Sequence, residues 1–225
     1  ETHQYPTNHG SAAFREAAAS FYRERFGVEL DPASEIVPAL GGKEAVGHIA
    51  LALLDPGDIC LSPDPGYPPY TSGPVFAGAE VHYLPLEEAN GFLPDLDAIP
   101  QAALERANLL FLDYPNNPTG AVVEPGYFEL AVEFARANDV VVVHDNAYSE
   151  LCYDGYRAPS FLETPGAKDV GVEIFSLSKE QMIEYTAQNP FDRFPDGRPK
   201  VPDGLIERAK GLSAEEVWAI LPNKG

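Results

Sequence analysis

Lys179 is a candidate reactive residue, because it follows a run that is typical of a buried strand. The run VEIFSLS covers residues 172–178 and ends directly before the lysine. A lysine held at the end of such a strand loses solvation, which lowers the pKa of its amine and makes it a nucleophile. A lone lysine at a strand end is more often simply solvated, so this position alone leaves both interpretations open.

Asp145 ends a second apolar run, VVVVHD, at residues 140–145. A carboxylate that emerges from a buried strand carries a desolvation cost unless a cation or a hydrogen-bond donor meets it. The alternative is an aspartate that caps a helix, which is common. Tyr148 lies three residues further on and would be on the same side if the turn is helical.

Three other segments place polar groups at turns. GGKEAV (41–46) has two glycines that would let backbone N–H groups at a helix start approach an anion. SPDPGYPPY (62–70) fixes Tyr67 in a rigid turn, where its ring could stack on a planar ligand. DYPNNPTG (113–120) offers two asparagine amides after a strand. Each has an ordinary alternative: a glycine-bearing turn, a packed turn tyrosine and a simple turn.

Short apolar runs alternate with helix-length segments over most of the chain. We predict strands at 35–40, 58–62, 80–86, 108–114, 140–145 and 172–178, and helices at 11–26, 43–54, 97–106 and 124–137. This alternation indicates an α/β fold with a mostly parallel sheet flanked by helices. Ligands bind beyond the carboxyl ends of the strands in such sheets. A proline-rich extended segment (189–203) and a helix from about Ser213 to Ile220 are expected to follow.

Composition excludes several classes of function. The 225 residues carry a formal charge of −20, which argues against a nucleic-acid partner. The sequence begins without a signal-peptide pattern and contains no apolar run of about 20 residues, so we expect a cytoplasmic protein without membrane contact. Cys60 and Cys152 match no metal or redox spacing, and no metal site is predicted. The charge is uneven: residues 1–179 carry −18 and residues 180–225 carry −2.

Six strings in this order resemble the pyridoxal 5′-phosphate (PLP) aminotransferases of fold type I, and the aspartate and LL-diaminopimelate aminotransferase-like group most closely. The strings are YPTNHGSAAFREAAA, GGKEAV, DPGYPPY, YPNNPTG, DNAYSE and SLSK, and they cover nearly all of residues 1–179. The resemblance implies the large, PLP-binding domain of that fold. It also implies amino-group transfer between an amino acid and a 2-oxo acid, and a homodimer.

The resemblance implies chemical roles around the cofactor ring. Lys179 would form the Schiff base with the cofactor aldehyde and later move a proton at the substrate carbon. Asp145 would pair with the ring nitrogen and keep it protonated. Asn117 and Tyr148 would hydrogen-bond the phenolate oxygen, and Tyr67 would stack on the ring.

The resemblance implies a second group of residues around the cofactor phosphate. Gly42 and Lys43 would bind it through backbone amides, and Ser176 and Ser178 through their hydroxyl groups. Tyr5 would reach the phosphate of the neighbouring subunit, which implies sites shared across a dimer.

The sequence departs from the family pattern after Lys179. The family continues with a glycine and an arginine that grips the phosphate, whereas EQMIEYTAQNPFD follows here and the first arginine is Arg193. We expect the small domain, with its substrate-binding arginine, and the usual segment before Glu1 to be absent. Residues 180–225 resemble instead the N-terminal arm of RraA-like aldolase-family proteins, on the strings NPFDRFPDGRPKVPD and AEEVWAIL. They are predicted to form an unrelated arm and helix, and a splice between two unrelated genes would explain the charge step at residue 180.

Three functions remain open at this point. The first is a truncated PLP-dependent aminotransferase with impaired turnover, because the arginines that bind phosphate and carboxylate are missing. The second is a non-catalytic PLP-binding remnant or scaffold. The third, drawn only from the tail, is an RraA-like aldolase or regulator.

Overall fold

The computed structural model describes residues 9–124 and 126–176. Tyr5, Ser178, Lys179, Arg193 and the segment predicted to be helical at 213–220 lie outside the described residues. The chain divides into two compact units. The described part of one comprises residues 9–25 and 29–38, and that of the other comprises residues 26–28, 39–124 and 126–176. The second unit contains the sheet.

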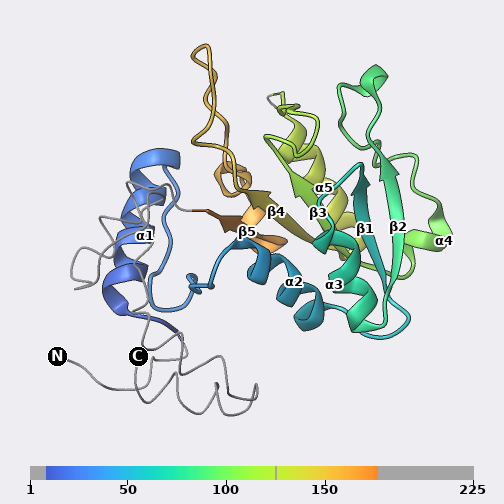
Figure 1. Ribbon diagram of the computed structural model, residues 1–225, viewed down its shortest axis with the longest axis horizontal. Helices are drawn as coiled ribbons and strands as arrows, with labels where there is room; N and C mark the ends of the chain where they lie inside the picture. The colour runs from blue at the N-terminus through green and yellow to red at the C-terminus, as the bar shows by residue number, and fades with distance from the viewer. Residues whose placement is uncertain (1–8, 125, 177–225) are drawn as a thin grey trace, which may run out of the picture. The chain divides into compact units, whose positions relative to one another are not determined.

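Five parallel strands form a single sheet in the order β2-β1-β3-β4-β5. The strands are β1 (Ile59–Asp64), β2 (Glu80–Pro85), β3 (Ala107–Asp113), β4 (Val141–Asn146) and β5 (Gly171–Phe175). Figure 1 shows β1 and β2 side by side with their arrowheads at the same edge. Apolar, β-branched runs such as VVV in β4 suit strands that are covered on both faces. The predicted α/β fold with a mostly parallel sheet flanked by helices is confirmed.

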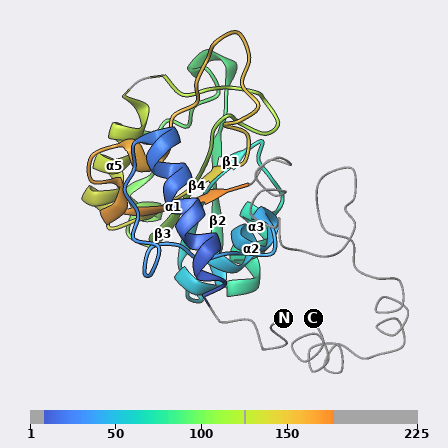
Figure 2. The ribbon, with the colours of Figure 1, turned by 90° about the vertical axis from the view of Figure 1, so that its left-hand side faces the viewer.

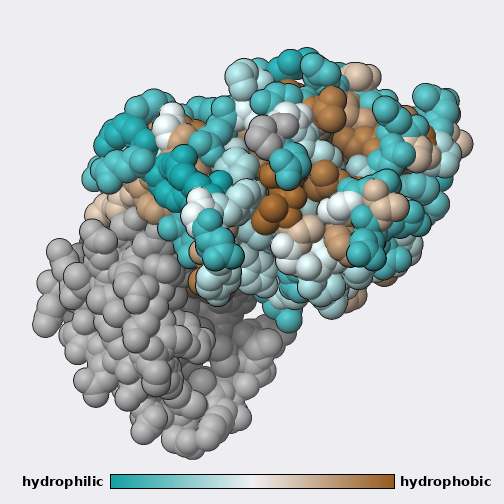
Figure 3. Space-filling model, turned by 90° about the horizontal axis from the view of Figure 1, so that it is seen from above, coloured by the Kyte–Doolittle hydropathy of each residue, from teal (hydrophilic) through white to brown (hydrophobic). Residues whose placement is uncertain are grey.

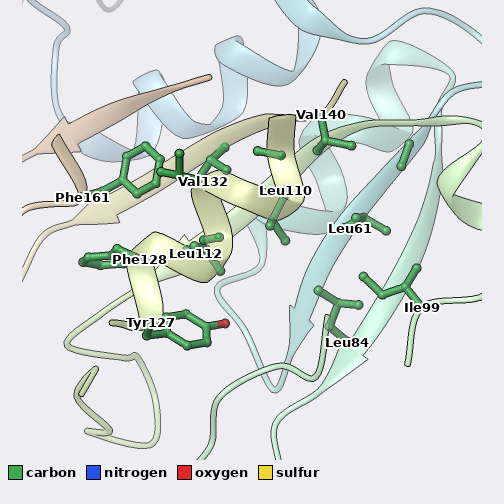
Figure 4. Packing of buried hydrophobic residues seen from close by; sticks show 14 of the residues in the cluster. Leu61, Leu84, Ile99, Leu110, Leu112, Tyr127, Phe128, Val132, Val140 and Phe161 are labelled. Carbon is green, nitrogen blue, oxygen red and sulfur yellow. The ribbon is translucent and has the colours of Figure 1, made fainter. Parts of the chain in front are cut away.

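Helix α5 (Tyr127–Asn138) covers one face of the sheet. Its buried side chains Phe128, Ala131, Val132 and Ala135 recur every three or four residues and so share one side of the helix. They pack with strand residues of this cluster and with Phe161, and Figure 4 labels Phe161 together with the strand residues Leu61, Leu110 and Leu112. This cluster holds the central strands from one side.

Helices α2 (Gly42–Leu53) and α3 (Pro69–Ala77) cover the opposite face. Figure 2 shows them together on one side of the sheet, with α5 on the other. Val46 and Ala50 of α2 are fully buried. A Cβ atom at Gly73 of α3 would lie 3.1 Å from the Ala50 Cβ, so the two helices are packed in close contact.

Several short elements connect the strands. They are α4 (Gln101–Leu104) and the 3-10 helices η1 (Glu88–Asn90), η2 (Phe161–Glu163) and η3 (Ala167–Asp169). Ser160 and Glu163 form a capping box at η2, in which the Ser160 hydroxyl accepts from a backbone N–H and Glu163 accepts from the Ser160 N–H at 2.6 Å.

The described residues of the other unit include most of helix α1 (Ala12–Phe26) and the segment that follows it. Ser11 precedes the helix, and its Oγ accepts a hydrogen bond from the Phe14 N–H at 3.1 Å. The Arg15 guanidinium donates to the carbonyl oxygens of Pro32 at 2.6 Å and His9 at 2.6 Å. Arg15 therefore ties the helix start to residues on both sides of it.

Two sequence predictions differ from the structure, and one helix was not predicted. Residues 35–40 are not a strand: Pro38 lacks an N–H for a ladder, and Val37 and Leu40 are 75% and 94% exposed. The helix predicted at 97–106 is only α4, because it starts after Pro100 and β3 begins soon after it. Helix α3 was not predicted, since its prolines indicate a turn. Pro68 and Pro69 stand at the start of the helix, where proline is tolerated, whereas Pro74 lies inside it.

The surface of the described chain is not uniformly polar. Figure 3 shows hydrophobic residues gathered among hydrophilic ones on the side that is uppermost in Figure 1. Large exposed side chains include Phe76 and Tyr153, both 79% exposed. Exposed hydrophobic residues are normal on folded proteins, so these positions define no site by themselves.

A buried carboxylate connects β5 to the rest of the sheet. The Glu173 carboxylate lies 2.7 Å from His144 Nδ1, and both side chains are fully buried. It also accepts hydrogen bonds from the Asn146 amide at 3.1 Å, the Ser160 hydroxyl at 2.9 Å and the Phe161 N–H at 2.9 Å. Strands β4 and β5 are therefore joined by side chains as well as by backbone.

The partners of His144 define its protonation. Nε2 lies 3.1 Å from the Tyr114 carbonyl oxygen, which can only accept, and Nδ1 faces the Glu173 carboxylate. The Glu173 carboxylate already accepts hydrogen bonds from Asn146, Ser160 and Phe161, which favours its ionised form. With an acceptor facing each ring nitrogen, this geometry places a proton on both and makes His144 an imidazolium. A buried cation and anion stand in direct contact.

Replacing Glu173 by glutamine tests this pair. Glu173→Gln leaves the imidazolium without its counter-charge, and removing one partner of a buried ion pair costs about 3–5 kcal/mol. We expect the free energy of unfolding, measured by urea titration at neutral pH, to fall by about 3 kcal/mol or more. The exposed Glu105→Gln is the matched control and should change little. An equally small effect of Glu173→Gln would show that the pair does not hold the sheet together.

Candidate active site

A cavity of about 200 Å³ lies at the carboxyl ends of the strands. Seven of the ten residues predicted for the cofactor site line it: Gly42, Lys43, Tyr67, Asn117, Asp145, Tyr148 and Ser176. Tyr70, Asp113 and Ala147 also line it and were not predicted. Ser178, Lys179 and Tyr5 fall outside the described residues. Segments that are far apart in sequence meet here because parallel strands end at the same edge of the sheet.

Asp145 is held by a tyrosine from helix α3. The Tyr70 hydroxyl donates to Asp145 Oδ2 at 2.8 Å, and the Tyr70 ring stacks on Phe111 with centroids 4.8 Å apart. Burial raises the pKa of Tyr70 far above its usual value, and the charges of Asp145 and Asp113 add to the rise. Tyr70 therefore remains a hydroxyl and a hydrogen-bond donor to the carboxylate.

Asp113 stands beside Asp145 on the neighbouring strand. The two residues are direct register partners in β3 and β4, and they are 2% and 7% exposed. Burial raises the pKa of Asp113 to about 7, and the charge of Asp145 adds to this rise, whereas the Asn117 N–H opposes it. Burial also raises the pKa of Asp145, against the hydrogen bond from Tyr70 and the charge of His144.

Asn117 and Tyr148 meet across the cavity. The Asn117 amide donates to the Tyr148 hydroxyl oxygen in a long contact of 3.5 Å. Asn117 is placed by a tight turn, in which its own N–H donates to Asp113 Oδ2 at 3.0 Å and Asn116 Oδ1 accepts from the Thr119 hydroxyl at 2.7 Å. Burial raises the pKa of Tyr148, and the nearby Asp113 charge adds to the rise, so its phenol stays protonated. A ligand oxygen can thus meet an amide and a phenol together.

The start of helix α2 forms another part of the cavity. Gly41 has φ of 112° and no side chain to cap the helix. A Cβ atom at Gly42 would lie 3.1 Å from Ser176 Oγ, so glycine leaves room between the helix start and this hydroxyl. Lys43 lines the same cavity. Backbone N–H groups at a helix start, a hydroxyl and an ammonium are the groups that bind an anion.

Tyr67 is held by the turn that follows β1. A Cβ atom at Gly66 would lie 2.4 Å from the Pro63 carbonyl oxygen, so the turn requires glycine. The Tyr67 ring packs edge-on against Tyr70, with centroids 5.8 Å apart and an interplanar angle of 80°. A half-buried ring fixed in this way is able to cover one side of a flat ligand.

Of the three cavity residues that were not predicted, Tyr70 and Asp113 were missed for different reasons. Tyr70 lies on α3, and this helix was not predicted because the prolines of PGYPPY indicate a turn. Asp113 had a signal in the sequence, because the apolar run NLLFLD ends in an aspartate just as VVVVHD does at Asp145. Reading the two runs as neighbouring parallel strands would have placed both carboxyl groups at one edge.

Neither a metal centre nor a membrane span occurs in the part of the chain that the structure describes. No three His, Cys, Asp or Glu side chains group so as to hold a metal ion there. None of its helices has the length and apolar character needed to cross a bilayer. The described cavity is lined by carboxyl, phenol, amide, hydroxyl, ammonium and backbone groups.

Replacing Asp113 by asparagine tests its raised pKa. Between about pH 4 and pH 7 the folded chain keeps a proton on Asp113 that the unfolded chain has released, so this residue lowers stability as pH rises. Asparagine does not titrate. The difference in unfolding free energy between Asp113→Asn and the native chain should therefore shift in favour of the variant by about 2–3 kcal/mol between about pH 5 and pH 8. Urea titrations at both pH values measure this, and a constant difference would contradict the assignment.

Comparison with known proteins places the chain in a family. A sequence model described as aminotransferase class I and II matches residues 1–181. An LL-diaminopimelate aminotransferase from Moorella thermoacetica is 57% identical over 179 residues, which are 80% of this chain and 46% of that protein. Another, from Desulforudis audaxviator, is 52% identical over 79% of this chain and 45% of its own length. The chain thus spans about half the length of the curated relatives it matches.

Solved structures show the same fold. Substrate-bound BacF from Bacillus subtilis matches with a TM-score of 0.76 and 42% identity, over 80% of this chain and 46% of that one. A probable N-succinyldiaminopimelate aminotransferase from Thermus thermophilus matches with a TM-score of 0.71 and 44% identity, over 76% of this chain and 45% of that one. The chain therefore belongs to the class I and II aminotransferases, a PLP-dependent family of fold type I.

Proposed function

We propose that this chain is the PLP-binding part of an aminotransferase that transfers an amino group between an amino acid and a 2-oxo acid. One observation carries the proposal: seven residues taken from five separate sequence motifs line a single cavity. The names of the relatives support LL-diaminopimelate as the amino-acid substrate. A homodimer in the cytoplasm, with Tyr5 reaching the partner's site, is part of the same proposal.

The groups around the cavity fit the ring of the cofactor. Bound PLP supplies an electron sink that stabilises negative charge on the substrate α-carbon. Asp145 offers a buried carboxylate for a protonated ring nitrogen, and Tyr70 orients it. Asn117 and Tyr148 offer two donors to a phenolate oxygen, and Tyr67 offers a ring face.

The groups at the start of α2 fit the phosphate. Gly42 leaves open the space beside Ser176 Oγ that a side chain would fill, and the helix dipole favours an anion there. Ser178 is proposed to add a second hydroxyl, and Lys179 to hold the cofactor aldehyde and to move a proton at the substrate α-carbon. Because Ser176 directly follows β5, the phosphate group would lie at the same sheet edge as Asp145.

We also propose that residues 180–225 form a separate unit of different origin. The end of the family match at residue 181 supports this boundary. The likeness of this segment to the arm of RraA-like proteins stays a prediction, because it lies outside the described residues.

The first test is covalent binding of PLP. Adding PLP to the purified chain should produce the visible absorbance band of the lysine-bound cofactor, and borohydride reduction followed by peptide mass spectrometry should place the label on Lys179. Lys179→Ala should abolish the band, whereas Lys168→Ala, a change at an exposed lysine, should not. Label on another lysine, or no label on the native chain, would overturn the proposal.

The second test concerns the ring nitrogen. Asp145→Asn removes the negative charge that meets it, and a lost charge-assisted hydrogen bond of about 1.5–3 kcal/mol predicts PLP affinity at least about tenfold lower. Tyr70→Phe keeps the carboxylate but removes its donor, so a loss of a few fold is expected. Tyr153→Phe, at a position that is 79% exposed, is the control for loss of a phenol. Equilibrium titration by absorbance gives all three affinities, and unchanged binding by Asp145→Asn would exclude its role.

A further inference from the structure

Two buried carboxyl groups stand side by side in the cavity. Asp113 and Asp145 are register partners on adjacent parallel strands, so their side chains leave the same face of the sheet. Both line the cavity, and both are nearly inaccessible to solvent. Two carboxylates that share a buried site cannot both be ionised without a large cost. The pair therefore carries a single negative charge when no cation is near.

Hydrogen bonds decide which of the two holds the charge. Asp145 accepts the single hydroxyl proton of Tyr70 at 2.8 Å. Asp113 accepts the Asn117 N–H on Oδ2, but its buried Oδ1 has no hydrogen-bond partner within the described residues. An ionised oxygen without a donor is unfavourable, so the proton belongs on Asp113.

The surrounding charges agree with this assignment. The pKa of Asp113 is shifted by the charges of Asp145 and the His144 imidazolium on β4 and by Tyr70 on α3. The charge of Asp113 in turn raises the pKa values of Tyr114 and Tyr148. Lys43 of α2 lines the same cavity. His144 projects from β4 next to Asp145 in sequence, on the opposite face of the sheet, because strand residues alternate. It is already paired with Glu173, so it does not fully compensate the two carboxyl groups.

We propose that Asp113 is a second carboxyl group of the cofactor site: it is protonated beside ionised Asp145 when the cavity is empty, and it releases this proton when the positively charged ring nitrogen of PLP pairs with Asp145. The inference rests on the proposed function, because it requires that the cavity holds PLP. The Asp113 O–H bond breaks, the proton passes to solvent, and the ring N–H bond stays intact. The bound state then has two carboxylates beside one ring cation.

A nearby cation stabilises both carboxylates, which is why binding expels the proton. The competing interpretation gives Asp113 only a structural task, that of accepting the Asn117 N–H in the turn. Asparagine can accept the same N–H and resembles a protonated aspartate in shape. Asp113→Asn therefore keeps the turn and removes only the titratable proton.

The experiment uses pyridoxine 5′-phosphate, which keeps the ring nitrogen and the phosphate but has no aldehyde to react with Lys179. Isothermal titration calorimetry near pH 6, in two buffers of different ionisation enthalpy, counts the protons released on binding. The native chain should release about one proton more than Asp113→Asn. Its affinity relative to that variant should rise by up to about tenfold per pH unit from pH 5 to pH 7, and then level off.

Two controls make the result specific. The exposed Asp97→Asn should behave as the native chain does. An analogue of the probe with C–H in place of the ring nitrogen should abolish the extra proton release in the native chain, without any mutation. Equal proton release by the native chain and Asp113→Asn would overturn the role of Asp113, while covalent PLP binding at Lys179 would leave the proposed function standing. If neither PLP nor the probe binds the native chain, both proposals fail.

Discussion

The buried ion pair between His144 and Glu173 is the interaction on which the arrangement of the cavity depends. The two residues are register partners on β4 and β5, and the side chains meet at 2.7 Å. A slip of one residue would turn every side chain of β5 to the other face and separate this pair. Asp145 follows His144 directly, and Ser176 directly follows β5, so the register that the ion pair selects also sets the relative positions of these two cavity residues.

The same pair also affects the charges in the cavity, although it lies on the opposite face of the sheet. His144 and Asp145 project from opposite faces of β4, because consecutive residues of a strand alternate. The imidazolium thus acts through the sheet and lowers the pKa of Asp113 and of Asp145, although burial raises both by more. A neutral histidine could not do this, and it could not donate to both Tyr114 and Glu173. One buried cation therefore supports the fold on one face and the carboxyl pair on the other.

Much of the fold and part of the cavity follow from local sequence pattern, and the errors have physical causes. The five strands are short apolar runs, and seven cavity residues belong to motifs at strand ends or helix starts, which a parallel sheet brings together. Residues 35–40 carry the strand pattern, but a local pattern does not say whether a partner strand exists.

Tyr70 depends on α3, whose stability comes from packing against α2 and the sheet rather than from the propensity of a segment that contains proline. The pairing of Asp113 with Asp145 depends on the register of β3 and β4, which no single segment displays. Lys179 falls outside the described residues, so its role still rests on the motif SLSK.

The groups that line the cavity are poorly suited to an empty pocket. Two carboxyl groups share one buried site, the Oδ1 atom of Asp113 lacks a partner within the described chain, and Gly42 keeps open a space that a side chain would fill. Each of these features costs stability in the absence of a ligand. A ligand that carries a cation to the carboxyl pair and an anion to the start of α2 would remove these costs together, and it would bind only the folded chain. Under the proposed function, a bound cofactor would therefore stabilise the folded chain by offsetting the cost of these features.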